Sequence, residues 1–230
     1  AEVEKYVSRN PRKPYIPCEY AHAMGNSTGA IQEYWELVRK YPSFQGGFVW
    51  DFADQALWRH DARGCWLAYG GDFGDKPESG TTCINGIVRA DRVPYPQYYE
   101  VQKVNQFLSF ELVSASNVKV NNGYSFTYAD EFDYFYEFVD DGRVVYSAEQ
   151  PINTNNILEI PSFDDTKGEV FLNVYARLRR PTVWADRGFT VAKEQFLLVE
   201  NTPVKLAAGT SVPQLQETAD SYTVQAGQET

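Results

Sequence analysis

The sequence predicts an α/β segment followed by an all-β region, and two observations support this prediction. Within the first 60 residues, two short apolar runs that each stop at an acidic residue flank one amphipathic helix pattern. From about residue 107 onward, short runs rich in β-branched and aromatic residues recur between turn signals. The 230 residues are 43% hydrophobic and 23% charged, which is the composition of a globular protein of one or two domains.

The α/β prediction depends on three elements. Residues 15–18 and 46–51 are the two predicted strands, and residues 28–41 are the predicted helix, with Asn26 or Ser27 as its N-cap. Residues 2–9 are expected to be the tail of a preceding helix. Apolar side chains at i, i+3, i+4 and i+7 define the buried face of helix 28–41, and these are Ile31, Tyr34, Trp35 and Val38.

A strand, helix, strand order with polar residues at the strand ends fits a (β/α)₈ barrel, because such barrels place their active sites at the carboxyl ends of the strands. Glu19 and Asp51 occupy these positions here. A whole barrel needs about 200–250 residues, and only about two strands precede residue 60. The sequence therefore predicts a piece of a barrel. The glycine- and proline-rich stretch 61–106 is predicted to be a long, ordered and functional loop region.

The second half of the chain is predicted to be an immunoglobulin-like β-sandwich, because seven or eight short strands follow one another over about 100 residues. Asp140-Asp141-Gly142 is a strong hairpin signal within this region. The tail 201–230 is expected to be a linker and, at 221–226, the first strand of a further β domain. The predicted strands are 107–112, 117–120, 124–128, 132–139, 143–147, 157–160, 170–178 and 195–199.

Charge and composition exclude several classes of function. With 21 Lys+Arg against 31 Asp+Glu, the net charge of -10 argues against a nucleic-acid partner. No apolar run approaches the roughly 20 residues of a membrane-spanning helix, and the N-terminus has no signal-peptide pattern. Three cysteines without CxxC spacing argue against a disulfide framework and a structural zinc site. The 15% of aromatic residues suits carbohydrate binding or core packing equally.

Three residues near the predicted strand ends are candidates for chemistry. Glu19 lies where a barrel places catalytic groups, and a helix-start or salt-bridged acid is an equal alternative. His22 could contact a ligand or a metal, although a single histidine more often has a structural role. Trp50 offers a face on which a sugar can stack, while a core tryptophan is the slightly favoured alternative.

The remaining candidates are weaker. Asp51 could pair with Glu19 in a two-carboxylate glycosidase site, but a buried structural acid held by backbone amides is favoured. Asn85 could bind a hard cation, but an Asx-turn beside Gly86 is favoured. His60 lies in a polar turn and is expected to be solvated. The sequence has no GxSxG, P-loop, GxGxxG or HExxH motif.

Several stretches in order carry a resemblance to a known family. Residues 14–57 resemble the late barrel strands of the large β-galactosidases of glycoside hydrolase family 2, and the match is dense to about residue 103 and weaker to about residue 200. The motifs are 18–27 (CEYAHAMGNS), which resembles the nucleophile motif, and 45–51 (QGGFVWD), 69–75 (YGGDFGD), 85–88 (NGIV) and 90–92 (ADR).

The resemblance implies a role for each of five residues. Glu19 would be the nucleophile that forms a covalent galactosyl-enzyme, and His22 would contact the galactose hydroxyls. Trp50 would pack against the apolar face of the sugar. Asn85 would ligate a sodium ion (Na+) that holds the galactose 6-hydroxyl, together with the backbone carbonyl of Thr82, a position that is usually aromatic in the family.

The resemblance also implies what this chain lacks. The acid/base and the ligands of the magnesium ion (Mg2+) would lie on earlier barrel strands outside the chain, so Asp51 is not the acid and the chain alone is expected to be inactive. The implied domains are the C-terminal part of the catalytic TIM barrel (1–106), the immunoglobulin-like sandwich (107–200) and the linker with the first strand of the next β domain (201–230).

The expected function is therefore that of a fragment of a retaining β-galactosidase that hydrolyses terminal β-D-galactosides such as lactose. The expected partners are the galactoside, the remainder of the polypeptide and further copies in a homo-oligomer, without nucleic acid or membrane. The family default is the cytoplasm, and a periplasmic enzyme would need a signal peptide upstream. A β-glucuronidase, a β-mannosidase and a non-catalytic structural fragment remain alternatives.

Overall fold

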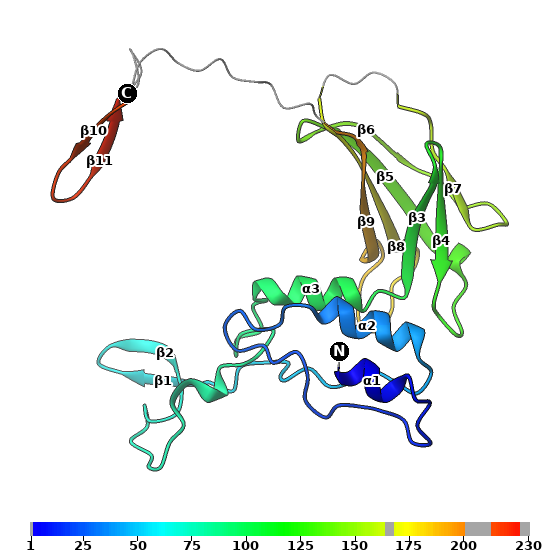
Figure 1. The fold of residues 1–230 in the computed structure, drawn as a ribbon. Helices are drawn as coiled ribbons and strands as arrows, with labels where there is room; N and C mark the ends of the chain where they lie inside the picture. The colour runs from blue at the N-terminus through cyan, green and yellow to red at the C-terminus, as the bar shows by residue number, and fades with distance from the viewer. Residues whose placement is uncertain (1, 164–167, 201–212, 226–230) are drawn as a thin grey trace.

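The computed structural model describes residues 2–163, 168–200 and 213–225, and it is richer in strands than in helices. The first part of the chain carries the helices, and the strands of the second part form the β region (Figure 1). The predicted linker 201–212 and residue 226 lie outside the described residues. In the described part of the tail, β10 (Gln214–Glu217) and β11 (Tyr222–Gln225) form an antiparallel hairpin where the sequence predicted one strand.

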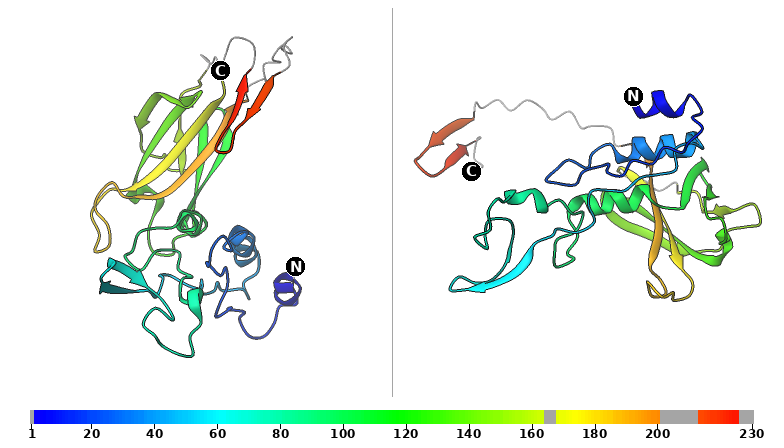
Figure 2. Two further views of the ribbon diagram at one scale, coloured as in Figure 1. Left: turned by 90° about the vertical axis from the view of Figure 1, so that its left-hand side faces the viewer. Right: turned by 90° about the horizontal axis from the view of Figure 1, so that it is seen from below.

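Three α-helices, α1 (Glu2–Val7), α2 (Ile31–Lys40) and α3 (Pro96–Val104), lie with similar axes and are seen end-on in Figure 2. The predicted helix periodicity is confirmed, because Ile31 is completely buried in a cluster with Tyr20 and Val104. The side-by-side packing of α2 and α3 thus covers the segment that follows Glu19.

The predicted N-cap of α2 is wrong. The residue before the helix is Ala30, which has a φ of 61° and makes no side-chain cap. The hydroxyl of Ser27 instead donates to the carbonyl oxygens of His22 and Met24, the latter at 2.7 Å. Neither Asn26 nor Ser27 therefore caps the helix, because the serine side chain closes the loop that precedes it.

The two predicted strands at 15–18 and 46–51 are extended segments with interrupted pairing. Isolated parallel bridges join Tyr15 to Phe44 and Tyr20 to Val49. Pro17 has no N–H to donate to a ladder, so a continuous strand cannot form around it. The parallel direction of the pairing is nevertheless the one that a (β/α) barrel requires.

The stretch 61–106 is more regular than the sequence indicated. An antiparallel hairpin of β1 (Leu57–Asp61) and β2 (Gly64–Ala68) begins it, a 3₁₀ turn η1 (Gly80–Cys83) follows, and α3 ends it. The sequence prediction missed α3 because Pro94 and Pro96 were counted as part of the glycine- and proline-rich loop region. Pro96 is in fact the first helical residue, where proline is well tolerated because its missing N–H is not needed.

The β region consists of two antiparallel sheets with a common core. One sheet has the order β3-β4-β7 and the other has the order β6-β5-β8-β9. Buried side chains of both sheets belong to one hydrophobic cluster, so the sheets pack face to face as a sandwich. The strands are β3 (Leu108–Ser114), β4 (Asn117–Asn122), β5 (Phe132–Asp140), β6 (Arg143–Glu149), β7 (Ile157–Glu159), β8 (Val170–Leu178) and β9 (Thr190–Val199).

The alternating pattern along β8 is confirmed, since every second residue of the strand is buried. The hairpin between β5 and β6 is also confirmed, with Asp141 and Gly142 at φ values of 43° and 77°. Both values suit the tight two-residue turns that match the twist of paired strands. The sandwich is therefore shown, while its assignment as immunoglobulin-like stays a prediction.

The predicted strand at 124–128 is wrong. Residues 123–128 form a loop that leads into a short 3₁₀ turn η2 (Ala129–Glu131). The side chain of Asn122 closes this loop, since its Oδ1 accepts from the Tyr124 N–H at 2.9 Å and its Nδ2 donates to the Thr127 carbonyl at 2.8 Å. The Asn122 side chain therefore makes hydrogen bonds to backbone groups that a neighbouring strand would otherwise bond.

Helix α3 connects the two parts. Lys103 Nζ lies 2.8 Å from Glu194 Oε2, and the Lys193 N–H donates to Gln106 Oε1 at 2.6 Å. These contacts fix the end of α3 against β9. Among the described residues, no helix has the length and apolar character needed to cross a membrane.

Candidate functional site

Backbone hydrogen bonds bring the segment after Glu19 alongside Trp50. The Tyr20 N–H donates to the Phe48 carbonyl at 2.9 Å, and the Trp50 N–H donates to the Tyr20 carbonyl at 3.2 Å. The Ala23 N–H then donates to the Trp50 carbonyl at 2.7 Å. The ends of these two extended segments are therefore adjacent, as the barrel prediction requires.

The loop of Asn85 joins the same group of segments. The Asp51 N–H donates to the Asn85 carbonyl at 2.8 Å, and the Ile87 N–H donates back to the Asp51 carbonyl at 2.9 Å. The peptide bond between Trp50 and Asp51 is cis. The three stretches that carry the predicted site residues thus meet at one place.

The side chains of Glu19, His22 and Trp50 are all exposed there. Within the described part of the chain, the Glu19 carboxylate has neither a salt bridge nor a hydrogen bond, and His22 Nδ1 only accepts from the Met24 N–H at 3.4 Å. Trp50 is 37% exposed, so the alternative of a core tryptophan is wrong. These three side chains are accessible to a ligand.

Asn85 is buried, with 4% of its surface exposed. Its Nδ2 donates to the Thr82 carbonyl at 2.8 Å, while its Oδ1 is buried and has no hydrogen-bond partner among the described residues. The favoured alternative of an Asx-turn is therefore wrong, because that turn needs Oδ1 as an acceptor. A buried amide oxygen without a donor is a suitable ligand for a hard cation such as sodium.

The interpretation of Asp51 as an acid held by backbone amides is also wrong. Its Oδ2 accepts from the side-chain amide of Gln55 at 2.7 Å, and its Oδ1 is buried without a partner among the described residues. Asp54 has the role that was expected of Asp51. It is 7% exposed, and its Oδ1 accepts from the Gly86 N–H at 2.9 Å.

Tyr95 completes the Asp54 contact by donating its hydroxyl to Oδ2 at 2.6 Å. Burial, together with the hydrogen bond to Asp54, raises the pKa of Tyr95 to about 12. The sequence analysis missed both residues, and the available signal was a second acid three positions after Asp51. Through these two hydrogen bonds, Asp54 and Tyr95 hold the loop of Asn85 in place. The loop also packs closely against Asp54, because a Cβ on Gly86 would collide with the backbone of Asp54.

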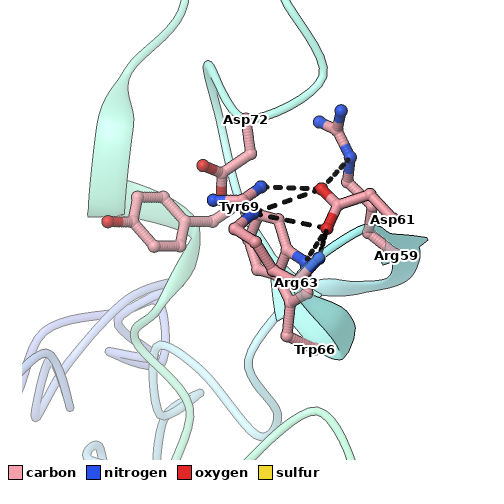
Figure 3. Close-up of polar contacts among 6 residues, drawn as sticks. All are labelled: Arg59, Asp61, Arg63, Trp66, Tyr69 and Asp72. Atoms are coloured by element: carbon pink, nitrogen blue, oxygen red, sulfur yellow. Dashed lines mark hydrogen bonds and ion pairs between the residues drawn. The ribbon is translucent and has the colours of Figure 1, made fainter.

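A second polar cluster lies on the β1–β2 hairpin and centres on Asp61 (Figure 3). Arg63 donates to it from Nη2 at 2.8 Å, Trp66 Nε1 lies 3.4 Å away, and Arg59 Nε lies at 3.6 Å. The hydrogen bonds from Arg63 hold the pKa of Asp61 well below its usual range. None of the predicted catalytic or binding residues belongs to this cluster. His60 is exposed, as expected, but it lies in strand β1 and not in a turn.

Comparison with known families agrees with this geometry. The model described as glycosyl hydrolases family 2, TIM barrel domain, matches residues 1–110. Residues 1–110 are therefore similar to the barrel domain of glycoside hydrolase family 2. A second model, described as beta-galactosidase, domain 4, matches residues 118–199. The two matches together define a β-galactosidase-like fragment, and they confirm the resemblance inferred from the sequence.

The Asp54–Tyr95 contact leads to a prediction about stability. Tyr95→Phe should lower the free energy of unfolding by about 1.5–3 kcal/mol at pH 8, the usual range for a hydrogen bond to a charged group. Tyr99→Phe is the matched control, because Tyr99 is 55% exposed. Chemical denaturation followed by circular dichroism measures both variants.

The same contact predicts a pH dependence. The raised pKa means that the neutral tyrosine is favoured in the folded state, so its contribution is complete below the unfolded value of about 10. That contribution is lost as the pH rises toward the folded value of about 12. The difference between the chain and Tyr95→Phe should shrink over this window, and a constant difference would contradict the assignment.

Proposed function

We propose that this chain carries the nucleophile of a retaining β-galactosidase, and that Glu19 is that nucleophile. One observation carries the proposal: the Glu19 carboxylate is exposed, has no partner among the described residues, and lies in the parallel-paired segment that bonds the backbone of Trp50, within the stretch that matches the family 2 barrel. Carboxyl ends of barrel strands are where such enzymes place their reacting groups.

In the proposed reaction, the Glu19 carboxylate attacks the anomeric carbon while the bond to the leaving group breaks. An acid/base residue, supplied by the remainder of the polypeptide, gives the leaving oxygen its proton. The same residue then takes a proton from the water that releases galactose from Glu19, so the configuration is retained. The two carboxyl groups of a retaining site lie about 5–5.5 Å apart.

His22 and Trp50 are proposed to bind the sugar. The imidazole of His22 can bond hydroxyl groups through its exposed ring nitrogens, and the exposed indole of Trp50 offers an apolar face to the C–H side of galactose. Both residues belong to the segments that backbone hydrogen bonds bring together, which supports their joint action on one ligand.

A sodium ion is proposed to bind at Asn85 Oδ1 and at the backbone carbonyl of Thr82, and it would hold the galactose 6-hydroxyl when bound. The buried Oδ1, which has no hydrogen-bond partner in the part of the chain that the structure describes, supports this assignment. The magnesium ligands are proposed to lie outside this chain, with the acid/base.

The sodium proposal predicts that Asn85→Ala, in the complete enzyme, raises the sodium concentration needed for half-maximal activity by at least about tenfold, the effect of losing one liganding oxygen. Asn121→Ala on strand β4 is the control. Sodium titration of kcat and KM makes the measurement, and an unchanged sodium requirement would rule the site out.

Terminal β-D-galactosides such as lactose are the proposed substrates. The match to a β-galactosidase domain over residues 118–199 supports galactose rather than the glucuronic acid or mannose specificity of other family 2 enzymes. The proposed boundaries are a barrel segment at 1–106 and an immunoglobulin-like sandwich at 107–200, and the complete enzyme is proposed to be a homo-oligomer.

Replacing the nucleophile should abolish catalysis. In the complete enzyme, Glu19→Gln is expected to lower kcat on nitrophenyl β-D-galactoside to below about a hundredth, since positioned carboxylates contribute orders of magnitude. Glu33→Gln on the exposed face of α2 is the matched control. Parallel assays on the nitrophenyl glucuronide and mannoside test the sugar preference. If Glu19→Gln retained most of the activity, another residue would be the nucleophile.

The 230-residue chain alone should not hydrolyse nitrophenyl β-D-galactoside, because the proposed acid/base lies outside it. Circular dichroism establishes that the assayed chain is folded. Turnover by the isolated chain at a rate comparable with that of the complete enzyme would show that a second carboxylate within it, with Asp51 the first to examine, completes the site.

A further inference from the structure

The first turn of helix α3 lies against two of the segments that carry proposed binding residues. Gln97 is the second residue of this helix, and its side chain is half-buried. Its Nε2 donates to the Ala23 carbonyl at 3.1 Å and to the Gly86 carbonyl at 3.4 Å. One side-chain amide therefore joins the residue that follows His22 to the residue that follows Asn85.

The two carbonyl groups that Gln97 bonds belong to buried residues. Ala23 is 1% exposed, and Gly86 is buried as well. Among the described residues, no other group donates a hydrogen bond to either carbonyl oxygen. Buried backbone carbonyls need a donor, and a primary amide carries two N–H groups on one nitrogen. The amide of Gln97 therefore meets the requirement of both segments at once.

Apolar packing and one further backbone hydrogen bond keep this turn of α3 within reach of both carbonyls. Ala23, Ile87 and Val88 form one buried cluster. Tyr98 of α3 packs against this cluster. The N–H of Tyr95, the residue before the helix, donates to the Ile87 carbonyl at 3.1 Å. The position of the Gln97 amide is therefore set by the buried contacts of its own helix.

The contacts of Gln97 give it an indirect role. The proposed sugar contact His22 comes directly before Ala23, and the proposed sodium ligand Asn85 comes directly before Gly86. Gln97 bonds the backbone of these two segments and is not itself one of the proposed ligand-binding residues. A change at Gln97 would therefore affect a bound ligand only through the two segments.

We infer that Gln97 is a positioning residue for the galactoside site, because it fixes the segment of His22 relative to the segment of Asn85 before substrate and sodium bind. This role rests on the proposed function, whereas the two hydrogen bonds do not. Segments that are already in place lose less conformational freedom on binding, which strengthens binding. Once sugar and sodium are bound, they also hold the segments. The contribution of Gln97 therefore falls on binding and not on the chemical step.

Gln97→Met tests this role in the complete enzyme, because methionine is similar in shape to glutamine and has no side-chain N–H group. Gln102→Met is the matched control. Gln102 lies in the same helix and is also half-buried, and its side chain makes no hydrogen bond within the part of the chain that the structure describes. Circular dichroism establishes that both variants are folded.

Amide hydrogen exchange, measured by mass spectrometry, tests the two hydrogen bonds without reference to activity. In Gln97→Met, peptides that cover residues 20–24 and 85–88 should exchange about fivefold faster, the usual effect of losing one hydrogen bond in each segment. Gln102→Met should leave both peptides unchanged, and strand β8 should exchange equally in all three proteins. Unchanged exchange of either segment in Gln97→Met would overturn the inference.

Steady-state kinetics on nitrophenyl β-D-galactoside at varied sodium concentration tests the positioning role itself. Gln97→Met should raise KM and the sodium concentration for half-maximal activity by about fivefold each. Its kcat at saturating sodium and substrate should change by less than about twofold, a division that a general loss of structure would not produce. An unchanged value of either binding quantity, or a loss confined to kcat, contradicts the role.

The unsubstituted enzyme separates this inference from the proposed function. If it hydrolyses the galactoside and Gln97→Met has the same KM and sodium requirement, only the role of Gln97 is refuted. If the unsubstituted complete polypeptide hydrolyses no galactoside, the proposed function is refuted, and the positioning role is refuted with it even where hydrogen exchange confirms the two hydrogen bonds.

Discussion

Parallel backbone pairing between the segments 15–23 and 44–50 is the constraint on which the candidate site depends. It places the end of one extended segment beside the next, and the Asp51 N–H then extends the pairing to the Asn85 loop. Helix α2 covers this pairing through Ile31, which has no exposed surface. The backbone hydrogen bonds between these segments are interrupted at proline and glycine residues. They nevertheless restrict the position of Glu19 more than an unpaired loop of the same length would.

The sequence predicted those features that come from regular periodicity or from long motifs. The alternation along β8 and the Asp141-Gly142 turn required only local rules, and the motif around Glu19 identified the family. The start of α2 could not be predicted, because the Ser27 side chain bonds the backbone of the preceding loop and does not cap the helix. The loop at 123–128 could not be predicted either, because the Asn122 side chain bonds backbone groups that would be paired in a strand. Asp54 was missed because its partners lie 32 and 41 residues away.

Exposed aromatic side chains follow one another on the barrel segment. Phe48 is 66% exposed and Phe52 62%, and both line one open hollow with Val49 and Ile87. Contiguous apolar surface of this kind usually marks a face that another part of a protein covers. This observation supports the proposal that the remainder of a barrel completes the site, while the sandwich has a full core of its own between its two sheets.

Because only glycine fits at position 86, the amino-acid substitutions that the Asn85 loop can accept are limited. Any larger residue at this position would push the loop away from Asp54, so natural variation and directed evolution alike are confined to the neighbouring solvent-facing positions. Thr81 and Thr82 are such positions, because both are exposed. The rim of the loop can therefore adapt to new ligands, while the buried amide of Asn85 keeps its position.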